Sequence, residues 1–189
     1  SNLILGNTYH LYLRPGHKLI ETAGGLHAFM NWKSALLTDS GGYQVFSLSK
    51  MNKISDEGVE FQSHLDGSSH YFTPEVLMEI QQSLGADIIM AFDECPTGNA
   101  DYATVEKAVI RTTRWAKHCT DYLSDHDAIH DWDQTFFPIV QGSTYTDLRR
   151  QSAEYIANSG AEGNAIGGLS VGEPADELYA MTEVVCEIL

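Results

Sequence analysis

Residues that could bind a ligand or transfer a proton follow directly after short apolar segments at four places in the chain. The apolar segments span residues 35–38, 88–92, 136–140 and 164–166. The residues that follow them are Asp39, Asp93, Gln141 and the glycine pair 167–168. A carboxylate can act as a general acid or base, a glutamine amide both donates and accepts hydrogen bonds, and glycine lets backbone N–H groups approach a ligand. The pattern predicts one polar pocket assembled from several strand ends.

The pair Asp93 and Gln141 offers a hydrogen-bond acceptor beside a donor. The Watson–Crick edge of guanine presents the N1–H and N2–H donors beside the O6 acceptor, so this pair is chemically matched to guanine. Tyr43 offers an aromatic face on which an unstacked base could lie. Each residue also has a plainer interpretation, because Tyr43 fits a core position and Gln141 fits a residue that ties loops together.

Asp39 opens the glycine-rich turn Asp-Ser-Gly-Gly-Tyr. It fits a turn aspartate that caps the following backbone, and it equally fits a general acid or base at a strand end. Asp93 favours the second interpretation, because two titratable groups then face one pocket. A glycosidase could also use Asp39 and Asp93 as its carboxylate pair. That alternative does not account for Gln141 or for the glycine loops.

The elements that must position these residues alternate between strand and helix. Strands are expected at 3–5, 35–38, 88–92, 136–140 and 164–167, and helices at about 15–23, 74–84, 103–123, 145–158 and from 175 onward. Five such βα units predict a parallel sheet covered by helices. An eight-stranded barrel needs about 250 residues, so we expect an incomplete (β/α)8 TIM barrel in which all the strand ends lie on one face. Residues 45–72 interrupt the alternation, and Asp66-Gly67 predicts a β-hairpin inserted in a βα loop.

The composition of the chain disfavours several classes of function. The 189 residues carry 11 Lys and Arg against 26 Asp and Glu, a net charge of −15, which disfavours binding of a phosphate backbone. No apolar run is long enough to span a bilayer and no signal-peptide pattern is present, so no membrane association is expected. The three cysteines, Cys95, Cys119 and Cys186, form no CxxC motif, which favours a reducing, cytoplasmic setting.

Three further patterns do not support a site. Residues 168–172 match G-x-S-x-G, but no histidine follows Ser170 and Pro174 interrupts the entry into a helix. The same segment fails the dinucleotide motif because position 169 is Leu. His126 and His130 are four residues apart but lack a third metal ligand nearby, so no metal site is expected in this chain.

Taken together, six ordered motifs resemble the bacterial tRNA-guanine transglycosylases, also called queuine tRNA-ribosyltransferases. The motifs lie at residues 4–16 (ILGNTYHL…LRPG), 38–45 (TDSGGYQV), 63–68 (SHLDGS), 90–95 (MAFDEC), 139–143 (IVQGS) and 167–173 (GGLSVGE). The resemblance runs from about residue 3 to at least Glu177, and the order of the motifs makes it specific. It implies a TIM-barrel pentosyltransferase of queuosine biosynthesis that replaces a guanine in a tRNA anticodon by 7-aminomethyl-7-deazaguanine through a covalent ribosyl-enzyme.

The resemblance also implies roles for individual residues. Asp39 matches the catalytic proton acceptor of the family. The residues that match its base-binding set are Ser40, Gly41, Gly42, Tyr43, Asp93, Gln141 and Gly168. The residues that match the rim of the pocket are Asn7, His10, Cys95, Leu169, Val171 and Glu173. Among these, Cys95 and Val171 resemble the bacterial form of the enzyme.

Two parts of the family pattern are missing from residues 1–189. The family's nucleophilic aspartate and its zinc site, made by three cysteines and a histidine, would follow Leu189. We therefore expect residues 1–189 to be a partial barrel domain that lacks the first strand region, the last strands and the zinc-binding part. Such a piece is expected to be inactive alone, whereas the full-length protein would bind tRNA and the base, carry zinc and form a homodimer. The alternative is a non-catalytic base-binding subunit or a remnant of the same fold.

Overall fold

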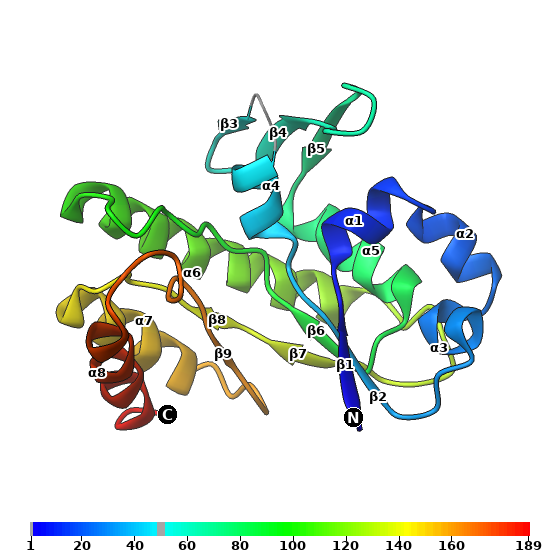
Figure 1. Ribbon diagram of the computed structural model, residues 1–189. Coiled ribbons are helices and arrows are strands. Elements are labelled where there is room, and N and C mark those ends of the chain that lie inside the picture. Colours follow the sequence, from blue (N-terminus) through cyan, green and yellow to red (C-terminus); the bar gives the residue numbers. More distant parts are fainter. Residues whose placement is uncertain (1, 49–51) are drawn as a thin grey trace.

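A computed structural model describes residues 2–48 and 52–189 and shows a parallel sheet with helices packed along it (Figure 1). Four neighbouring parallel strands are, in spatial order, β1 (Leu3–Gly6), β2 (Ala35–Thr38), β6 (Ile88–Met90) and β7 (Thr135–Phe137). After Pro138 the last of these continues as β8 (Ile139–Val140), which pairs in parallel with β9 (Ala165–Ile166). Proline lacks the N–H that an uninterrupted ladder requires, which is consistent with the break at residue 138.

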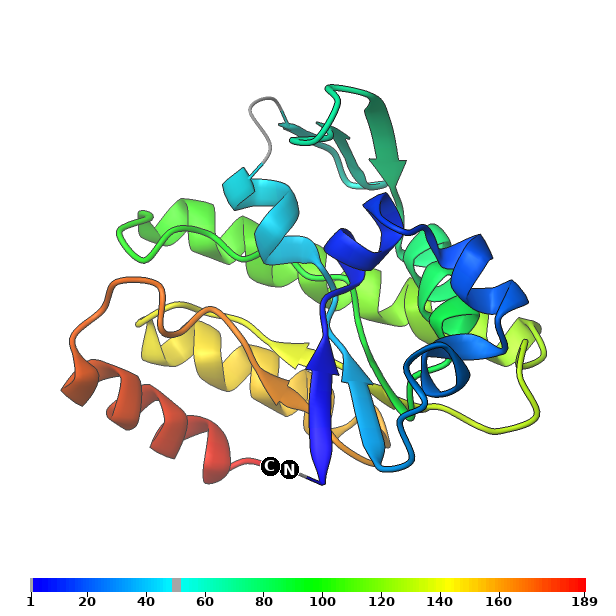
Figure 2. The same ribbon diagram turned by 45° about the vertical axis from the view of Figure 1, so that its right-hand side comes forward.

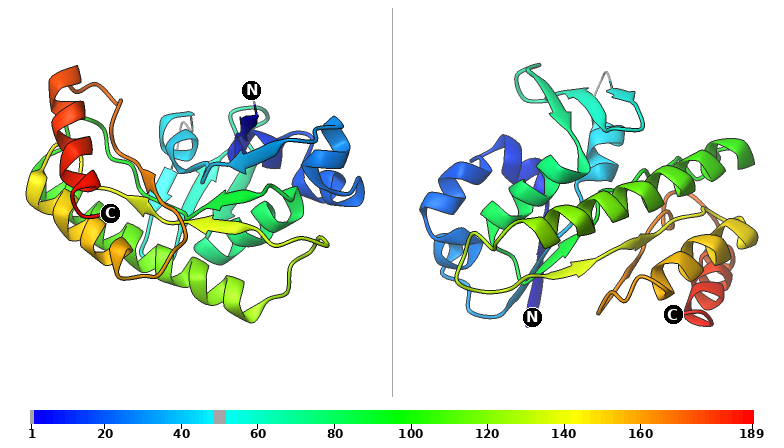
Figure 3. Two further views of the ribbon diagram at one scale, coloured as in Figure 1. Left: turned by 90° about the horizontal axis from the view of Figure 1, so that it is seen from below. Right: turned by 180° about the vertical axis from the view of Figure 1, so that it is seen from behind.

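Eight helices are seen in the described residues. They are α1 (Thr8–Leu13), α2 (His17–Thr22), α3 (Gly25–Met30), α4 (Gly42–Leu48), α5 (Pro74–Leu84), α6 (Tyr102–Asp125), α7 (Thr146–Ala157) and α8 (Ala175–Cys186). Seen from behind, α5, α6 and α7 lie along one face of the sheet, and α8 packs against α7 (Figure 3). None of the helices in the described part of the chain combines the length and the apolar character that a bilayer span requires.

The boundaries of the longer helices follow from local capping chemistry. The Thr73 hydroxyl accepts the Val76 N–H at 3.2 Å, and Pro74 then occupies the first helical position of α5, where its missing N–H costs nothing. Gly85 ends this helix with a left-handed backbone (φ 68°). The Asp101 carboxylate caps α6 in the same way by accepting the Thr104 N–H at 2.8 Å.

A second, antiparallel sheet stands at the end of the molecule where the parallel strands terminate (Figure 2). Its strands are β3 (Asn52–Ile54), β4 (Val59–Gln62) and β5 (Ser69–Phe72). Asp56, in the turn between β3 and β4, binds Arg111 at 3.2 Å and Arg114 at 2.8 Å, both on α6. The carbonyl oxygen of Asp56 also accepts the Trp115 indole N–H at 2.8 Å, so this turn is fastened to α6 at three points.

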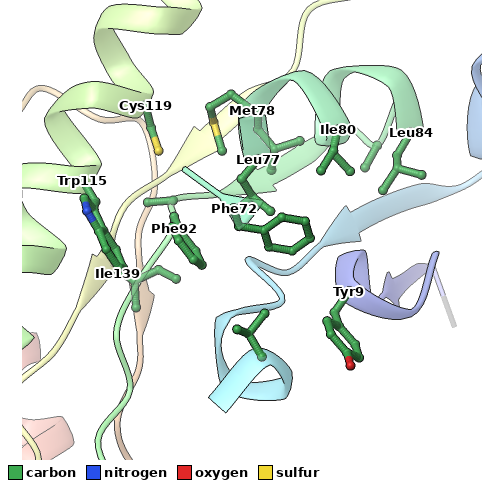
Figure 4. Close-up of a cluster of buried hydrophobic side chains, with 14 of the residues drawn as sticks. Tyr9, Phe72, Leu77, Met78, Ile80, Leu84, Phe92, Trp115, Cys119 and Ile139 are labelled. Carbon is green, nitrogen blue, oxygen red and sulfur yellow. The ribbon is translucent and has the colours of Figure 1, made fainter. Parts of the chain in front are cut away.

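The main core lies between the parallel sheet and helices α5 and α6 (Figure 4). Phe92 stacks on Trp115 with ring centroids 4.5 Å apart, and both side chains are fully buried. Leu77, Met78 and Leu84 supply the sheet-facing side of α5. This packing holds the end of β6, and hence Asp93, against a rigid helical layer.

The predicted α/β class is confirmed, and the five consecutive strand positions are those of an incomplete (β/α)8 barrel. The expected helix from Pro15 begins two residues later, because Gly16 has a φ of 102° and is its N-cap. The short helices α1, α3 and α4 were not expected. The insertion is a three-stranded sheet rather than a two-stranded hairpin, and residues 49–51 of the interrupting stretch lie outside the described part.

Candidate functional site

The ends of β2, β6, β8 and β9 surround a cavity of about 370 Å³. Among the predicted site residues, those that line it are Asp39, Ser40, Tyr43, Asp93, Cys95, Gly167, Gly168, Leu169 and Val171. The lining residues that the sequence analysis did not name are Gln44, Met90, Ile139, Ala165 and Ile166, and Ser170, which was rejected as a nucleophile, also lines the cavity. Strand ends far apart in the sequence therefore form one cavity.

Asp39 is held by three hydrogen-bond donors at the end of β2. Asn7 Nδ2 donates to Oδ2 at 2.6 Å, and the backbone N–H groups of Thr8 and Gly41 donate to Oδ1 at 2.9 and 3.1 Å. The bond to Gly41, two residues further on, is the turn interaction considered above. Burial raises the pKa of Asp39, while the three donors act in the opposite direction. The carboxyl group is thus oriented by its neighbours and also lines the cavity.

Asp93 lies at the centre of a hydrogen-bonded row that crosses three strand ends. The Ser40 hydroxyl donates to Oδ1 at 2.5 Å, and Gln141 Nε2 donates to Oδ2 at 2.7 Å. All three side chains are buried, with Asp93 at 5% exposure. Burial raises the pKa of Asp93, the two donors lower it, and the nearby Asp39 charge raises it further. Each carboxylate oxygen keeps a lone pair for a ligand donor.

Gln141 is held by hydrogen bonds both at its backbone and at its side-chain amide. Its backbone N–H donates to the Ser152 hydroxyl at 3.0 Å, and its amide nitrogen is held by Asp93. Its Oε1 atom is buried and has no hydrogen-bond partner among residues 2–48 and 52–189. A buried polar atom without a partner is costly, so this oxygen is a candidate for a bond to a ligand.

At three positions near these side chains, neighbouring atoms lie so close to the backbone that only glycine fits. A Cβ on Gly42 would lie 2.6 Å from the Asp93 carbonyl oxygen, and a Cβ on Gly41 would lie 2.9 Å from the Tyr9 nitrogen. A Cβ on Gly168 would lie 2.2 Å from Gln141 Oε1, and the φ of this residue is +63°. The glycine-rich loops therefore bring backbone directly against the polar row.

The remaining predicted residues surround this centre in different ways. Tyr43 is half exposed, so its ring is not part of the core. His10 is exposed and does not line the cavity. The Glu173 carboxylate accepts the backbone N–H groups of Ser170 and Val171, the latter at 3.0 Å, and so braces the loop that carries Leu169.

The Cys95 thiol lines the cavity and is partly buried. Burial raises its pKa to about 11, and the nearby Asp93 charge acts in the same direction. The backbone of Gly168 acts on this pKa in the opposite direction. The neutral thiol is therefore the form present near neutral pH.

Arg149 is a further residue of this region that the sequence analysis did not place at the site. It is fully buried on α7, beneath the loops that follow β8 and β9, and binds the carbonyl oxygens of Val140, Ser143, Gly167 and Gly168. Its position was readable from the helical period, because it shares the buried face of α7 with Ser152, Ala153 and Ile156.

The two histidines in the connection after α6 face different backbone carbonyls. His126 contacts the Tyr122 oxygen at 2.8 Å, and His130 contacts the Ser83 oxygen at 3.1 Å. Across residues 2–48 and 52–189, no three His, Cys, Asp or Glu side chains are grouped as a metal ion would require. The residues present thus do not fit a zinc ion.

A model of the protein family described as queuine tRNA-ribosyltransferase matches residues 1–189. The chain belongs to the queuine tRNA-ribosyltransferase family. It is 56% identical over 189 residues to the queuine tRNA-ribosyltransferase of Caldanaerobacter subterraneus subsp. tengcongensis, with 100% of the chain and 49% of the relative covered.

Two further queuine tRNA-ribosyltransferases give the same result. The chain is 54% identical over its whole length to that of Symbiobacterium thermophilum, of which 46% is covered. It is 54% identical over 183 residues to that of Staphylococcus aureus strain JH9, with 97% of the chain and 47% of the relative covered. The chain thus spans about half the length of the curated relatives it matches. Membership of the queuine tRNA-ribosyltransferase family confirms the resemblance drawn from the six motifs.

Proposed function

We propose that the protein that carries this chain exchanges a guanine in a tRNA anticodon for 7-aminomethyl-7-deazaguanine, and that this chain supplies the base-binding pocket. The observation that carries the proposal is the buried row Ser40–Asp93–Gln141 at the edge of a cavity of about 370 Å³. Two donors orient the Asp93 carboxylate, and its free lone pairs are complementary to the N1–H and N2–H groups of a guanine-like base.

The rest of the cavity suits a flat heterocycle. Tyr43, half exposed beside the cavity, supplies a face for stacking, and glycine at position 168 lets the backbone reach the edge of the base. Cys95, Leu169 and Val171 form the adjoining wall. An unstacked base read by hydrogen bonds on its edge and by aromatic contact on its face is the usual arrangement in base-modifying enzymes.

Asp39 is assigned the role of general base. A carboxylate of the complete protein attacks C1′ of the ribose, the bond from C1′ to N9 of guanine breaks, and the electron pair leaves with the base. The incoming base then loses its N9 proton to Asp39, and its nitrogen displaces the carboxylate from C1′. The desolvated position of Asp39 raises its pKa and makes it a stronger base than an exposed aspartate.

The other requirements of the reaction are assigned outside residues 1–189. They are the nucleophilic carboxylate, a zinc ion with its protein ligands, and a basic surface for tRNA. We propose in addition that the complete protein is cytoplasmic and acts as a homodimer. The net charge of −15 of this chain supports placing the phosphate contacts elsewhere, so residues 1–189 alone are expected to be inactive.

The test is incorporation of labelled guanine into tRNA by protein expressed from the whole gene. Exchange is expected for the unaltered protein and for Asp121→Asn, which changes only an exposed ion pair on α6, and it is expected to be lost in Asp93→Asn. Guanine binding without exchange would instead support a non-catalytic base-binding subunit or a remnant of the fold. Absence of both binding and exchange would refute the proposed pocket.

A further inference from the structure

Arg149 is a buried cation whose hydrogen bonds all go to backbone carbonyl groups. Its side chain is 0% exposed. Nε donates to the Ser143 oxygen at 2.7 Å, Nη1 to the Val140 and Gly167 oxygens at 3.3 and 2.6 Å, and Nη2 to the Gly168 oxygen at 2.9 Å. Within the described residues, no carboxylate lies close enough to form an ion pair with it. Burial lowers its pKa to about 10, so the guanidinium stays charged at neutral pH.

The two carbonyls of the β9 loop that Arg149 holds belong to successive peptide units. In a trans peptide unit the C=O and the following N–H point in opposite directions. Because Arg149 binds the oxygens of Gly167 and Gly168, the N–H groups of Gly168 and Leu169 are turned to the side away from the guanidinium. One side chain thus fixes the direction of two adjacent backbone donors.

Those two donors belong to residues that line the cavity. Gly168 and Leu169 both form part of its wall. The φ of +63° at Gly168 lets the two peptide units turn in succession, and glycine adopts this conformation without steric cost. Successive N–H groups of this kind form a concave site for an electronegative atom.

We propose that Arg149 is a positioning residue of the pocket: it turns the N–H groups of Gly168 and Leu169 toward the ligand as a paired donor site for the oxygen at C6 of a guanine-like base. This inference rests on the proposed function. Asp93 then receives the N1–H and N2–H donors, and the paired N–H groups receive the neighbouring oxygen. The guanidinium charge also polarises the two peptide units and strengthens their donors.

The test compares guanine with 6-thioguanine in the protein expressed from the whole gene. Both bases offer the same N1–H and N2–H donors, but sulfur at C6 is a weaker acceptor than oxygen. The variants are Arg149→Lys and Arg149→Met, and the control is Arg150→Lys at the next position, where the side chain is exposed and pairs with Glu187. Dissociation constants are measured by calorimetry, and folding is checked by thermal unfolding.

The unaltered protein and Arg150→Lys are expected to prefer guanine by about tenfold. The Arg149 variants are expected to lose most of this preference, because they weaken the binding of guanine more than the binding of 6-thioguanine. A folded Arg149 variant that keeps the preference would overturn the inference, since a residue needed only for folding would weaken both bases equally. If Arg149→Met does not fold, Arg149→Lys decides the question. If the unaltered protein binds neither base, the proposed function fails instead.

Discussion

The amide nitrogen of Gln141 lies 2.7 Å from Oδ2 of Asp93, although the two residues are 48 positions apart in the chain. The bond joins the end of β8 to the end of β6 inside a buried site. Because the other Asp93 oxygen accepts from Ser40, the carboxylate has one fixed orientation toward the cavity. This arrangement is the basis of the proposed preference for a ligand edge that carries two donors.

Asp93→Asn is expected to weaken guanine binding by at least about tenfold. The asparagine amide would face donors from Ser40, Gln141 or the base, and a mismatched buried polar group costs about 1–3 kcal/mol. Calorimetric titration with guanine measures the effect, and Asp121→Asn on the exposed side of α6 is the control. Unchanged affinity in Asp93→Asn would remove Asp93 from the base-binding set.

Gly168→Ala is expected to block the pocket, whereas Gly160→Ala is expected only to destabilise the fold. Both glycines have positive φ, +63° and +74°, so each alanine carries a backbone cost of about 1–2 kcal/mol. A Cβ at 168 would in addition meet Gln141 Oε1 at 2.2 Å, while a Cβ at 160 has no neighbour within 4 Å in the part of the chain that the structure describes. Denaturant unfolding of both variants measures the cost of backbone strain, and guanine titration measures the effect of the contact with Gln141. Equal guanine affinity in both would contradict the close packing at Gly168.

Arg111→Gln is expected to reduce the free energy of unfolding by about 3 kcal/mol, because it leaves the largely buried Glu94 carboxylate without its charged partner. Lys117→Gln, on the same helix, breaks an exposed pair with Asp121 and is expected to change the free energy of unfolding far less, because water screens that pair. Urea unfolding of the two variants gives the comparison. A similar small loss in both would show that the Arg111–Glu94 contact contributes little to stability.

Alkylation is expected to distinguish the three cysteines. Cys186 is exposed, whereas burial raises the pKa of Cys95 to about 11 and that of Cys119 to about 12. Since the thiolate is the reactive form, iodoacetamide at pH 7.5 should modify Cys186 first and leave Cys119 unmodified in the folded protein. Peptide mass spectrometry over time measures the order. Rapid modification of Cys95 would show that its thiol is less protected than the structure indicates.

Base exchange is expected to fall at low pH with an apparent pKa above the usual 3.8 of an aspartate. Burial raises the Asp39 pKa, and the group must be deprotonated to accept the N9 proton, so activity is lost as pH decreases through that raised value. Asp39→Asn should lower exchange by about 10²–10⁴-fold and still allow a ribosyl adduct to be trapped on denaturing gels. A variant that exchanges base at a near-normal rate would exclude the role.

Much of the fold could be predicted because the signals are local and periodic. Short apolar segments alternate with helices whose N-cap residues, such as Thr73 and Asp101, can be recognised from their residue types. Because parallel strands bring their ends to one edge, the sequence predicts Asp39 and Asp93 in one pocket. Ser40 lies beside Asp93 because β2 and β6 are neighbouring strands, and this strand order is known only from the structure.

The parts that could not be predicted depend on tertiary contacts. Helix α1 has only six residues, and its Asn7 cap is itself held by Asp39, 32 positions away. The helical period places Arg149 on the buried face of α7, but the carbonyl groups that allow a charged side chain to be buried there come from loops that are not adjacent in sequence. The unexpected features are therefore those in which segments far apart in the sequence supply hydrogen-bond partners to one another.

The position of Arg149 has a consequence for how such proteins can diverge. Loops at strand ends usually tolerate insertions. The segment 141–149 begins with a residue that holds Asp93 and ends with one that holds the next loop, so an added residue would displace one of these two anchors. By contrast, Gly160 has open space around it, and length changes there disturb neither anchor. Ligand preference on this side of the cavity can therefore evolve by exchange of side chains but not by growth of the loop.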